Sequence, residues 1–318
     1  MTAPRVSVVI PTYRRAGFLR EAVDSALAQT VQDAEVIVVE DGSRDAEEVL
    51  RPLGARVRYA WQPNQGAAAA RNLGAELAAG EWLAFLDDDD LWLPDKLARQ
   101  LAHVEGAPEI GLVHTAYFHQ TDGGRRLAPR FSRRGPIPTG WVTDALFADN
   151  FILTSSTLVR RRAFAAVGGF DTRYVRAQDY DLWLRLSCEH RFGFVADPLA
   201  VYRIHPGTLT ERIDAPLTRA DVLGRFLDTH PGVRARLGRD RVRRRFAEVH
   251  LDYARRFFWA DTLPAAQRHF LAAWAWNPRN VRALVYAGVC RGGLRFVTRL
   301  RSARRLVAPG SADAGRPR

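Results

Sequence analysis

Cysteine is scarce in this chain. Its 318 residues include only Cys188 and Cys290, too few for a disulfide framework, so we expect a reducing compartment. The sequence does not open with a charged segment followed by an apolar core, and we therefore expect no secretion signal. The longest late apolar run, around residues 281–289, is well short of the roughly 20 residues that a membrane-spanning helix needs. Together these absences predict a cytoplasmic protein without a transmembrane helix.

Familiar cofactor motifs are also missing. After the first expected strand the chain reads Pro-Thr-Tyr-Arg-Arg at residues 11–15, where a dinucleotide-binding fold would carry G-x-G-x-x-G. The P-loop pattern is absent as well, and the histidines other than His205 show no spacing typical of zinc ligands. These absences disfavour a nicotinamide or flavin cofactor and a zinc site.

Positive charge is unevenly distributed. The net charge of the whole chain is +12, but residues 1–200 hold 23 Lys and Arg against 26 Asp and Glu, and residues 201–318 hold 24 against 9. The basic character therefore belongs to the last third. It indicates that this third binds an acidic partner, either a membrane or a nucleic acid, and it says little about catalysis.

What the sequence has in quantity is an alternation of apolar strands and helical patterns. With 47% hydrophobic residues it can bury a large core. Strands followed by amphipathic helices predict an α/β fold, with a mostly parallel, Rossmann-like sheet flanked by helices. The strands are expected at residues 6–10, 35–39, 57–60, 81–86, 110–118, 151–159 and 199–204.

Four consecutive carboxylates follow one of these strands. Asp87 to Asp90 come directly after the apolar run ending at Leu86, at the carboxyl edge where open α/β sheets bind their ligands. A solvated acidic loop would explain an isolated run of this kind. Adjacent carboxylates also suit a divalent cation, magnesium or manganese, that bridges to substrate phosphates. The second strand likewise ends in acids, Glu40 and Asp41, which favours the cation.

Four ordered segments resemble the family 2 glycosyltransferases. They are Val-Ser-Val-Val-Ile-Pro-Thr-Tyr at 6–13, Val-Val-Glu-Asp-Gly-Ser at 38–43, the segment 65–74 with Arg71-Asn72 and Gly74, and Phe-Leu-Asp-Asp-Asp-Asp-x-Trp at 85–92. The resemblance covers roughly residues 4–210. It implies the GT-A fold, a nucleotide-sugar donor and inversion at the anomeric carbon.

The resemblance also assigns site residues. It implies that Asp87 and Asp89 form the metal-binding Asp-x-Asp pair, with Asp88 as an alternative partner, and that His205 approaches the metal or the phosphates. From its position before the next helix, Asp90 is expected only to cap that helix. The resemblance makes Asp179 the catalytic base, although Gln178 stands where the family usually has Glu. Asp181 is instead expected to pair with Arg185 on the helix surface. The residues expected to bind the donor nucleotide are Pro11, Thr12, Tyr13, Glu40, Asp41, Arg71 and Asp88.

The implied organisation is a catalytic domain at residues 1–212, a basic helical extension at 213–307 and a disordered tail at 308–318. The catalytic domain divides into a nucleotide-sugar half, about 1–118, and an acceptor half, about 119–212. Residues 120–138 are expected to form a mobile loop.

The leading interpretation is a hexosyltransferase that uses a divalent cation, manganese or magnesium. It would move sugar from a nucleotide-diphosphate donor, with a UDP-sugar favoured, to a glycan or lipid-linked acceptor in cell-envelope glycan synthesis. The basic amphipathic run at 291–305 would bind peripherally to the inner face of an anionic membrane, and no nucleic acid is expected. Two alternatives remain, a non-catalytic nucleotide-sugar binder and an anion or nucleic-acid binder acting through the arginine-rich end.

Overall fold

The computed structural model describes residues 3–121, 123–127, 129, 136–205 and 219–293. The chain divides into two compact units, Met1–Phe226 and Leu227–Arg318. The expected run at 291–305, the tail at 308–318 and the loop at 120–138 lie wholly or partly outside the described residues.

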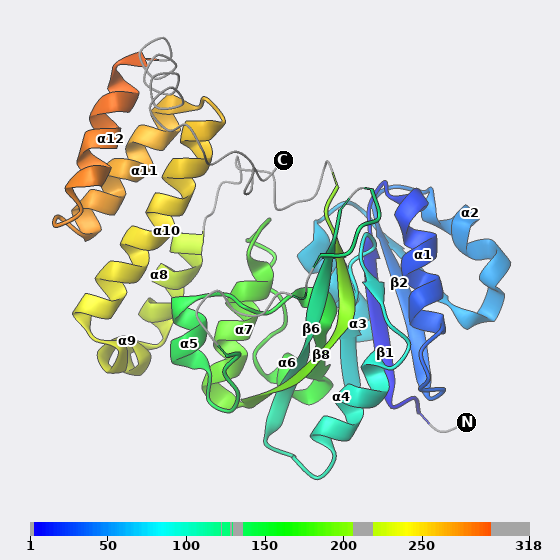
Figure 1. Ribbon diagram of the computed structural model, residues 1–318. Coiled ribbons are helices and arrows are strands. Elements are labelled where there is room, and N and C mark those ends of the chain that lie inside the picture. The colour runs from blue at the N-terminus through cyan, green and yellow to red at the C-terminus, as the bar shows by residue number, and fades with distance from the viewer. Residues whose placement is uncertain (1–2, 122, 128, 130–135, 206–218, 294–318) are drawn as a thin grey trace. The chain divides into compact units, whose positions relative to one another are not determined.

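The first unit is built on one eight-stranded sheet with helices on both faces (Figure 1). The strand order is β3-β2-β1-β4-β7-β6-β8-β5. The predicted α/β fold class is confirmed. The strands are β1 Val6–Thr12, β2 Ala34–Asp41, β3 Arg58–Gln62, β4 Trp82–Phe85, β5 Leu91–Trp92, β6 Ile110–Gln120, β7 Thr157–Arg160 and β8 Arg191–Arg203.

The first half of the sheet is parallel, as the βα alternation predicts. Strand β1 pairs in parallel with β2 and β4, and β2 pairs in parallel with β3. The connecting helices are α1 Ala16–Leu27, α2 Ala46–Leu50 followed by the 3-10 helix η1 Arg51–Arg56, and α3 Ala67–Leu77. Parallel strands bring their carboxyl ends to one edge, so the polar segments after β1, β2 and β4 meet there.

Strand β1 is longer than expected, because Pro11 does not stop it. Pro11 pairs with Val39 of β2, while the pairing with β4 ends at Val9 and Phe85. A proline lacks the N–H that a second neighbour would require. It is tolerated here because β4 has already ended on that side.

The second half of the sheet is mixed. Strand β7 is antiparallel to both β4 and β6, and β8 is parallel to β6 but antiparallel to β5. The strand expected at 151–159 begins only at Thr157, since Thr154–Ser156 form the 3-10 helix η2. The helices here are α4 Lys96–Val104, α5 Thr143–Ala148, α6 Arg161–Ala166 and α7 Gln178–Glu189.

Two contacts show how closely the layers pack. A Cβ built on Gly74 of α3 would lie 2.3 Å from Val9 Cγ1, so only glycine lets this helix lie so close to β1. On α4, the only lysine of the sequence, Lys96, is completely buried. Its Nζ donates to Gln100 Oε1 at 2.8 Å and to the Thr157 carbonyl at 3.2 Å, and lies 4.0 Å from the centre of the Trp92 ring. Burial holds the pKa of Lys96 well below its usual range.

The C-terminal unit is helical. Helix α8, Arg219–Thr229, crosses the division after Phe226. The helices that follow it are α9 Pro231–Leu237, α10 Arg239–Trp259, α11 Leu263–Trp276 and α12 Val281–Arg291. Ala254, Phe258, Phe270 and Ala287 belong to a separate apolar core formed by α10, α11 and α12. Within the residues that the structure describes, no helix combines the length and apolar character needed to cross a membrane.

Candidate functional site

An open pocket of about 460 Å³ lies at the carboxyl edge of the first unit's sheet. Its walls come from the segments after β1, β2 and β4, from the start of α3, and from residues near 172–175 and 202. The site residues predicted from the sequence that line it are Pro11, Thr12, Tyr13, Asp41, Arg71, Asp87, Asp88 and Asp89. Chain segments more than 70 residues apart in sequence therefore build one cavity.

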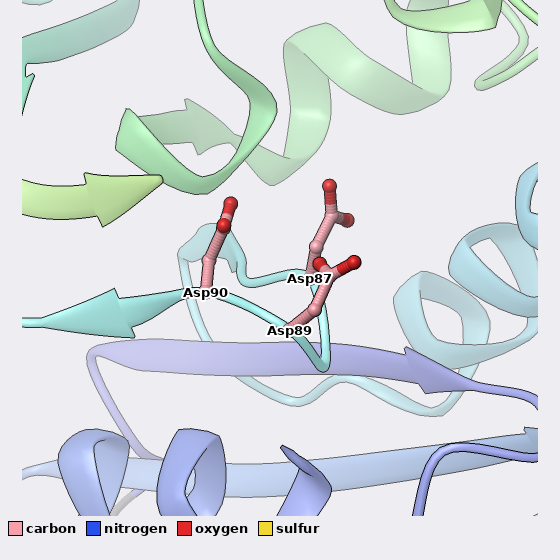
Figure 2. Close-up of side chains that lie close together, drawn as sticks. All are labelled: Asp87, Asp89 and Asp90. Carbon is pink, nitrogen blue, oxygen red and sulfur yellow. The ribbon is translucent and has the colours of Figure 1, made fainter. Parts of the chain in front are cut away.

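The acidic loop, residues 86–90, carries the carboxylates into this edge. Asp87, Asp89 and Asp90 each offer one oxygen, and these oxygens lie within 4.8 Å of one another. Figure 2 shows the three side chains rising from one loop, with the Asp87 and Asp89 carboxylates on the same side and Asp90 set apart. Hard carboxylate oxygens at this spacing fit a magnesium or manganese ion. Asp87 and Asp89 are the residues that would hold it.

Asp88 and Asp89 make different contacts. Asp88 accepts a hydrogen bond from Thr12 Oγ1 at 2.7 Å and pairs with Arg15, and Asp89 pairs with Arg15 and with His205. Burial, followed by the adjacent Asp89 carboxylate, raises the pKa of Asp88 to about 7. His205 Nε2 lies 3.1 Å from Asp89 Oδ2, and its ring stacks on Phe18. The structure thus brings His205 to the acidic loop through Asp89.

Asp90 does not cap the following helix. Its Oδ2 accepts from Ser155 Oγ at 2.5 Å and its Oδ1 accepts from the backbone N–H of Arg203 at 3.1 Å, whereas α4 begins only at Lys96. The side chain is fully buried, and burial raises the pKa of Asp90 well above its usual range. Asp90 therefore fastens the acidic loop to η2 and β8.

The two acids at the end of β2 also differ. Asp41 Oδ1 accepts from Gln62 Nε2 and from the backbone N–H of Gln65, and its Oδ2 accepts from the Gly66 N–H at 2.8 Å. It lines the pocket and fixes the loop before α3. Glu40 is completely buried, and its carboxylate accepts hydrogen bonds from Ser43, Tyr59 and two backbone N–H groups. Glu40 is not among the residues that line the pocket.

Arg71 projects from α3 into the same edge. One of its Nη atoms pairs with Asp87, and not with Glu76 or Asp41. Within the described residues, its buried Nε and Nη1 have no hydrogen-bond partner. A buried N–H group without an acceptor is costly, and two on one guanidinium beside a pocket suit an anionic ligand such as a diphosphate.

Asp179 lies in the first turn of α7, where the helix dipole favours an acid. It is half-buried, and Thr154 Oγ1 lies 3.4 Å from its Oδ2. Burial raises the pKa of Asp179, a shift that Arg71 opposes and Asp87 reinforces. The residue before the helix, Ala177, has a left-handed backbone with φ 59°, a strained conformation that is typical of functional sites.

The expected pair between Asp181 and Arg185 forms, but it does not lie on the helix surface, because the Asp181 side chain is only 7% exposed. Arg185 Nη2 lies 2.6 Å from Asp181 Oδ2 across one helical turn, and the same guanidinium donates to the carbonyls of Val167 and Gly169. Asp181 therefore holds the Arg185 side chain that fastens α7 to the preceding turn, and its carboxylate is occupied by that pair.

Sequence reasoning missed two residues of this site, Arg15 and Ser155. Arg15 contacts Asp88 and Asp89, and Ser155 contacts both ends of the acidic loop through Asp90 and the Asp87 N–H. The position of Arg15 directly after β1 was a usable signal, because that edge also receives the acids. Ser155 gave no comparable signal, since its contacts depend on the fold of η2.

The sheet edge carries a paired-acid loop, an acid-anchored loop before α3 and a further acid at a later helix start, as the resemblance to glycosyltransferases of the GT-A fold implies. The chain belongs to glycosyl transferase family 2, whose model matches residues 7–168. The resemblance carried by the four ordered segments is thereby confirmed.

Two curated relatives illustrate the match. The amylovoran biosynthesis glycosyltransferase AmsB of Erwinia amylovora is 32% identical over 215 residues, covering 62% of this chain and 69% of AmsB. A glycosyltransferase of Rickettsia felis is 31% identical over 223 residues, or 65% of this chain. The chain spans only 34% of the length of that relative.

Solved structures share the fold. The S. aureus TarS fragment 1–349 in complex with UDP-GlcNAc aligns with a TM-score of 0.58 at 16% identity, over 91% of this chain and 92% of that fragment. The mannosyltransferase PcManGT of Pyrobaculum calidifontis, in complex with GDP-Man and Mn2+, aligns with a TM-score of 0.58 at 20% identity, over 96% of this chain and 81% of its own.

Proposed function

We propose that this protein is a metal-dependent, inverting glycosyltransferase. It transfers a sugar from a nucleotide-diphosphate donor to an acceptor hydroxyl. The observation that carries the proposal is an acidic pair and an arginine of α3 that line one pocket, with a separate carboxylate, Asp179, close enough to interact with both. Asp87 and Asp89 lie beside Arg71, whose two unpartnered nitrogens suit a diphosphate, and Asp179 lies within electrostatic reach of both Arg71 and Asp87.

Each residue has a distinct role in this mechanism. The loop anchored by Asp41, together with Pro11, Thr12 and Tyr13, holds the nucleotide, and Arg71 holds the diphosphate. A divalent cation on Asp87 and Asp89 would offset the negative charge that develops on the leaving nucleoside diphosphate.

Asp179 acts on the opposite reactant. It takes the proton of the acceptor hydroxyl while that oxygen forms its bond to the anomeric carbon and the bond to the diphosphate breaks. The proton ends on the Asp179 carboxylate. Its raised pKa makes it a stronger base than an ordinary aspartate.

The relatives support a choice of substrates. One structural neighbour binds UDP-GlcNAc and another binds GDP-Man with Mn2+, and AmsB acts in amylovoran biosynthesis. We therefore propose a UDP-sugar donor, a manganese or magnesium ion, and a glycan or lipid-linked acceptor in envelope polysaccharide synthesis. Residues 1–212 form the proposed catalytic domain of a cytoplasmic enzyme.

A panel of nucleotide sugars tests this proposal by calorimetry, with and without manganese, followed by product analysis with candidate acceptors. We expect one base to bind preferentially, and only with the cation present. Inversion is checked by the anomeric configuration of the product. Cation-independent binding of every nucleotide would contradict the metal assignment, and donor binding without transfer or slow hydrolysis would favour the non-catalytic alternative.

A membrane is the partner that we propose for the C-terminal unit. Helix α12 buries Ala283, Ala287 and Cys290 but leaves Val281, Leu284 and Val285 exposed by 60%, 41% and 58%. These three residues recur at positions i, i+3 and i+4, so they form one apolar stripe. Residues 262–312 contain nine arginines and no Asp or Glu. An apolar stripe in an acid-free, basic segment suits an anionic bilayer better than a nucleic acid.

Vesicle sedimentation of the full chain tests the membrane proposal. Binding is expected to vesicles that contain phosphatidylglycerol and to be weak with phosphatidylcholine alone. The double substitution of Leu284→Ser and Val285→Ser should reduce binding by about thirtyfold, since each buried aliphatic side chain contributes on the order of 1 kcal/mol and about 1.4 kcal/mol is a factor of ten. Trp141→Ser is the control, because Trp141 is 65% exposed on the other unit. Equal losses in both variants, or preferential binding to duplex DNA, would overturn the proposal.

A further inference from the structure

Arg15 lies between two members of the acidic loop. Its Nη1 is 3.2 Å from Asp88 Oδ1 and also donates to Asp89 Oδ2. The Arg15 side chain is 24% exposed, whereas those of Asp88 and Asp89 are only 5% and 11% exposed. A largely buried pair of adjacent carboxylates thus has a cation supplied by the chain itself.

The Asp89 oxygen that Arg15 contacts is also a candidate ligand of a divalent cation. Asp89 belongs to the carboxylate cluster that fits a divalent cation, and His205 Nε2 also lies 3.1 Å from Asp89 Oδ2. A guanidinium and a divalent cation repel each other at such short range. A cation bound to Asp89 and an Arg15 side chain in the position seen here are therefore competitors.

From its position in the pocket wall, the Arg15 side chain can also reach a ligand bound in the pocket. Arg15 lines the same pocket as Arg71 and Asp41, directly after β1, and its long side chain can turn without moving the strand. Guanidinium groups match the geometry of phosphate oxygens and form short, charge-assisted hydrogen bonds with them.

We propose that Arg15 is a resident counterion that exchanges ligands during donor binding. In the cation-free protein it neutralises Asp88 and Asp89 and holds the acidic loop in place. When a divalent cation binds Asp89, Arg15 releases that carboxylate and binds the diphosphate of the donor. The inference rests on the metal site of the proposed function but concerns the chain's own side chain.

A purely structural clamp makes the opposite prediction. If Arg15 only held the loop together, its loss would loosen the acidic cluster and weaken cation binding. If Arg15 competes with the cation, its loss tightens cation binding and weakens donor binding. The sign of the change in manganese affinity therefore distinguishes the two roles.

The experiment compares Arg15→Gln with Arg14→Gln in the full chain by calorimetry, using manganese alone and then UDP in the presence of manganese. Arg14→Gln is a close control because it removes the same charge one residue away. The Arg14 guanidinium contacts the Tyr13 ring, 5.1 Å from its centre. For Arg15→Gln we expect manganese to bind about five times more tightly and UDP about ten times more weakly, as the loss of a charged hydrogen bond implies. For Arg14→Gln we expect manganese affinity within about twofold of the wild type.

Weaker or unchanged manganese binding by Arg15→Gln would overturn the proposal, as would equal changes in the two variants. Arg15→Lys guards against misfolding, because it keeps the positive charge but replaces the guanidinium whose Nη1 contacts both carboxylates; its manganese affinity should lie between those of the wild type and Arg15→Gln. If neither wild type nor variant binds manganese, the metal site of the proposed function fails. If the wild type binds manganese and Arg15→Gln does not differ from it, only the exchange fails.

Discussion

The Asp179 side chain owes its basicity to its surroundings. It is half-buried at the start of α7, and burial raises the pKa of its carboxyl. Asp181, two residues later in the same turn, forms an ion pair with Arg185. Two acids in one helical turn are therefore expected to differ sharply in function.

Asp179→Asn removes the proposed base with little change in shape. We expect kcat to fall by about a hundred- to ten-thousand-fold, the range typical of general bases, with UDP and manganese affinities unchanged. The measurement is steady-state transfer together with calorimetry. Asp181→Asn is the matched control and should retain kcat within about threefold, assayed well below its Tm. Similar losses in the two variants would point to a shared structural cause.

Among elements, the three-residue helix η2 connects two parts of the site. Ser155 Oγ donates to Asp90 and accepts from the Asp87 N–H, and its carbonyl accepts from Trp92 Nε1 at 2.6 Å. Thr154 reaches Asp179. The same turn thus positions the acidic loop on one side and the proposed base on the other.

Ser155→Ala should weaken manganese binding by about tenfold, as expected when a group that orients a ligand loop is lost. It should also lower the free energy of unfolding by about 1–3 kcal/mol, because the buried Asp90 oxygen loses a donor. Ser156→Ala is the control, since Ser156 is equally buried but its hydroxyl donates to the Leu153 carbonyl. Urea unfolding and calorimetry measure the two effects. A loss of manganese affinity in Ser156→Ala as large as in Ser155→Ala would contradict a positioning role.

The sequence was sufficient for some elements and not for others. Strands β1, β2 and β4 were predictable because they are continuous apolar runs, and the acids that follow them had to meet at one edge. The turn at η2 was not predictable, because Thr154–Ser156 read as part of a β-branched strand until the fold supplied Asp90 and Asp179 as partners. Glu40 and Asp41 are adjacent in sequence, and only the fold reveals that one carboxylate faces inward to Tyr59 while the other borders the pocket.

At the scale of the whole molecule, a buried histidine in β6 makes the free energy of unfolding depend on pH. His114 is 2% exposed between the rings of Phe151 and Phe194, and burial lowers its pKa to about 3. The unfolded chain binds a proton near pH 6.5, whereas the folded protein does not bind it until about pH 3. Titration of His114 therefore has no effect on the free energy of unfolding above pH 6.5 and lowers it progressively as the pH falls toward 3.

Between pH 7 and pH 5 this difference should remove about 2 kcal/mol from the free energy of unfolding. Urea unfolding of the wild type and of His114→Gln at both pH values measures it. The other titrating groups contribute similarly to both proteins, so the variant should lose about 2 kcal/mol less than the wild type. Parallel pH profiles would show that His114 does not carry the effect.

Lys96 has a practical consequence for following this protein in solution. The sequence contains no other lysine, and this one is enclosed between Trp92, Gln100 and the Thr157 carbonyl. An amine-directed reagent can reach its Nζ only when the layers of the first unit separate. The rate at which Lys96 is labelled therefore reports how often the first unit opens, without any engineered probe. A bound nucleotide sugar should slow that rate by a factor of one plus its concentration divided by its Kd.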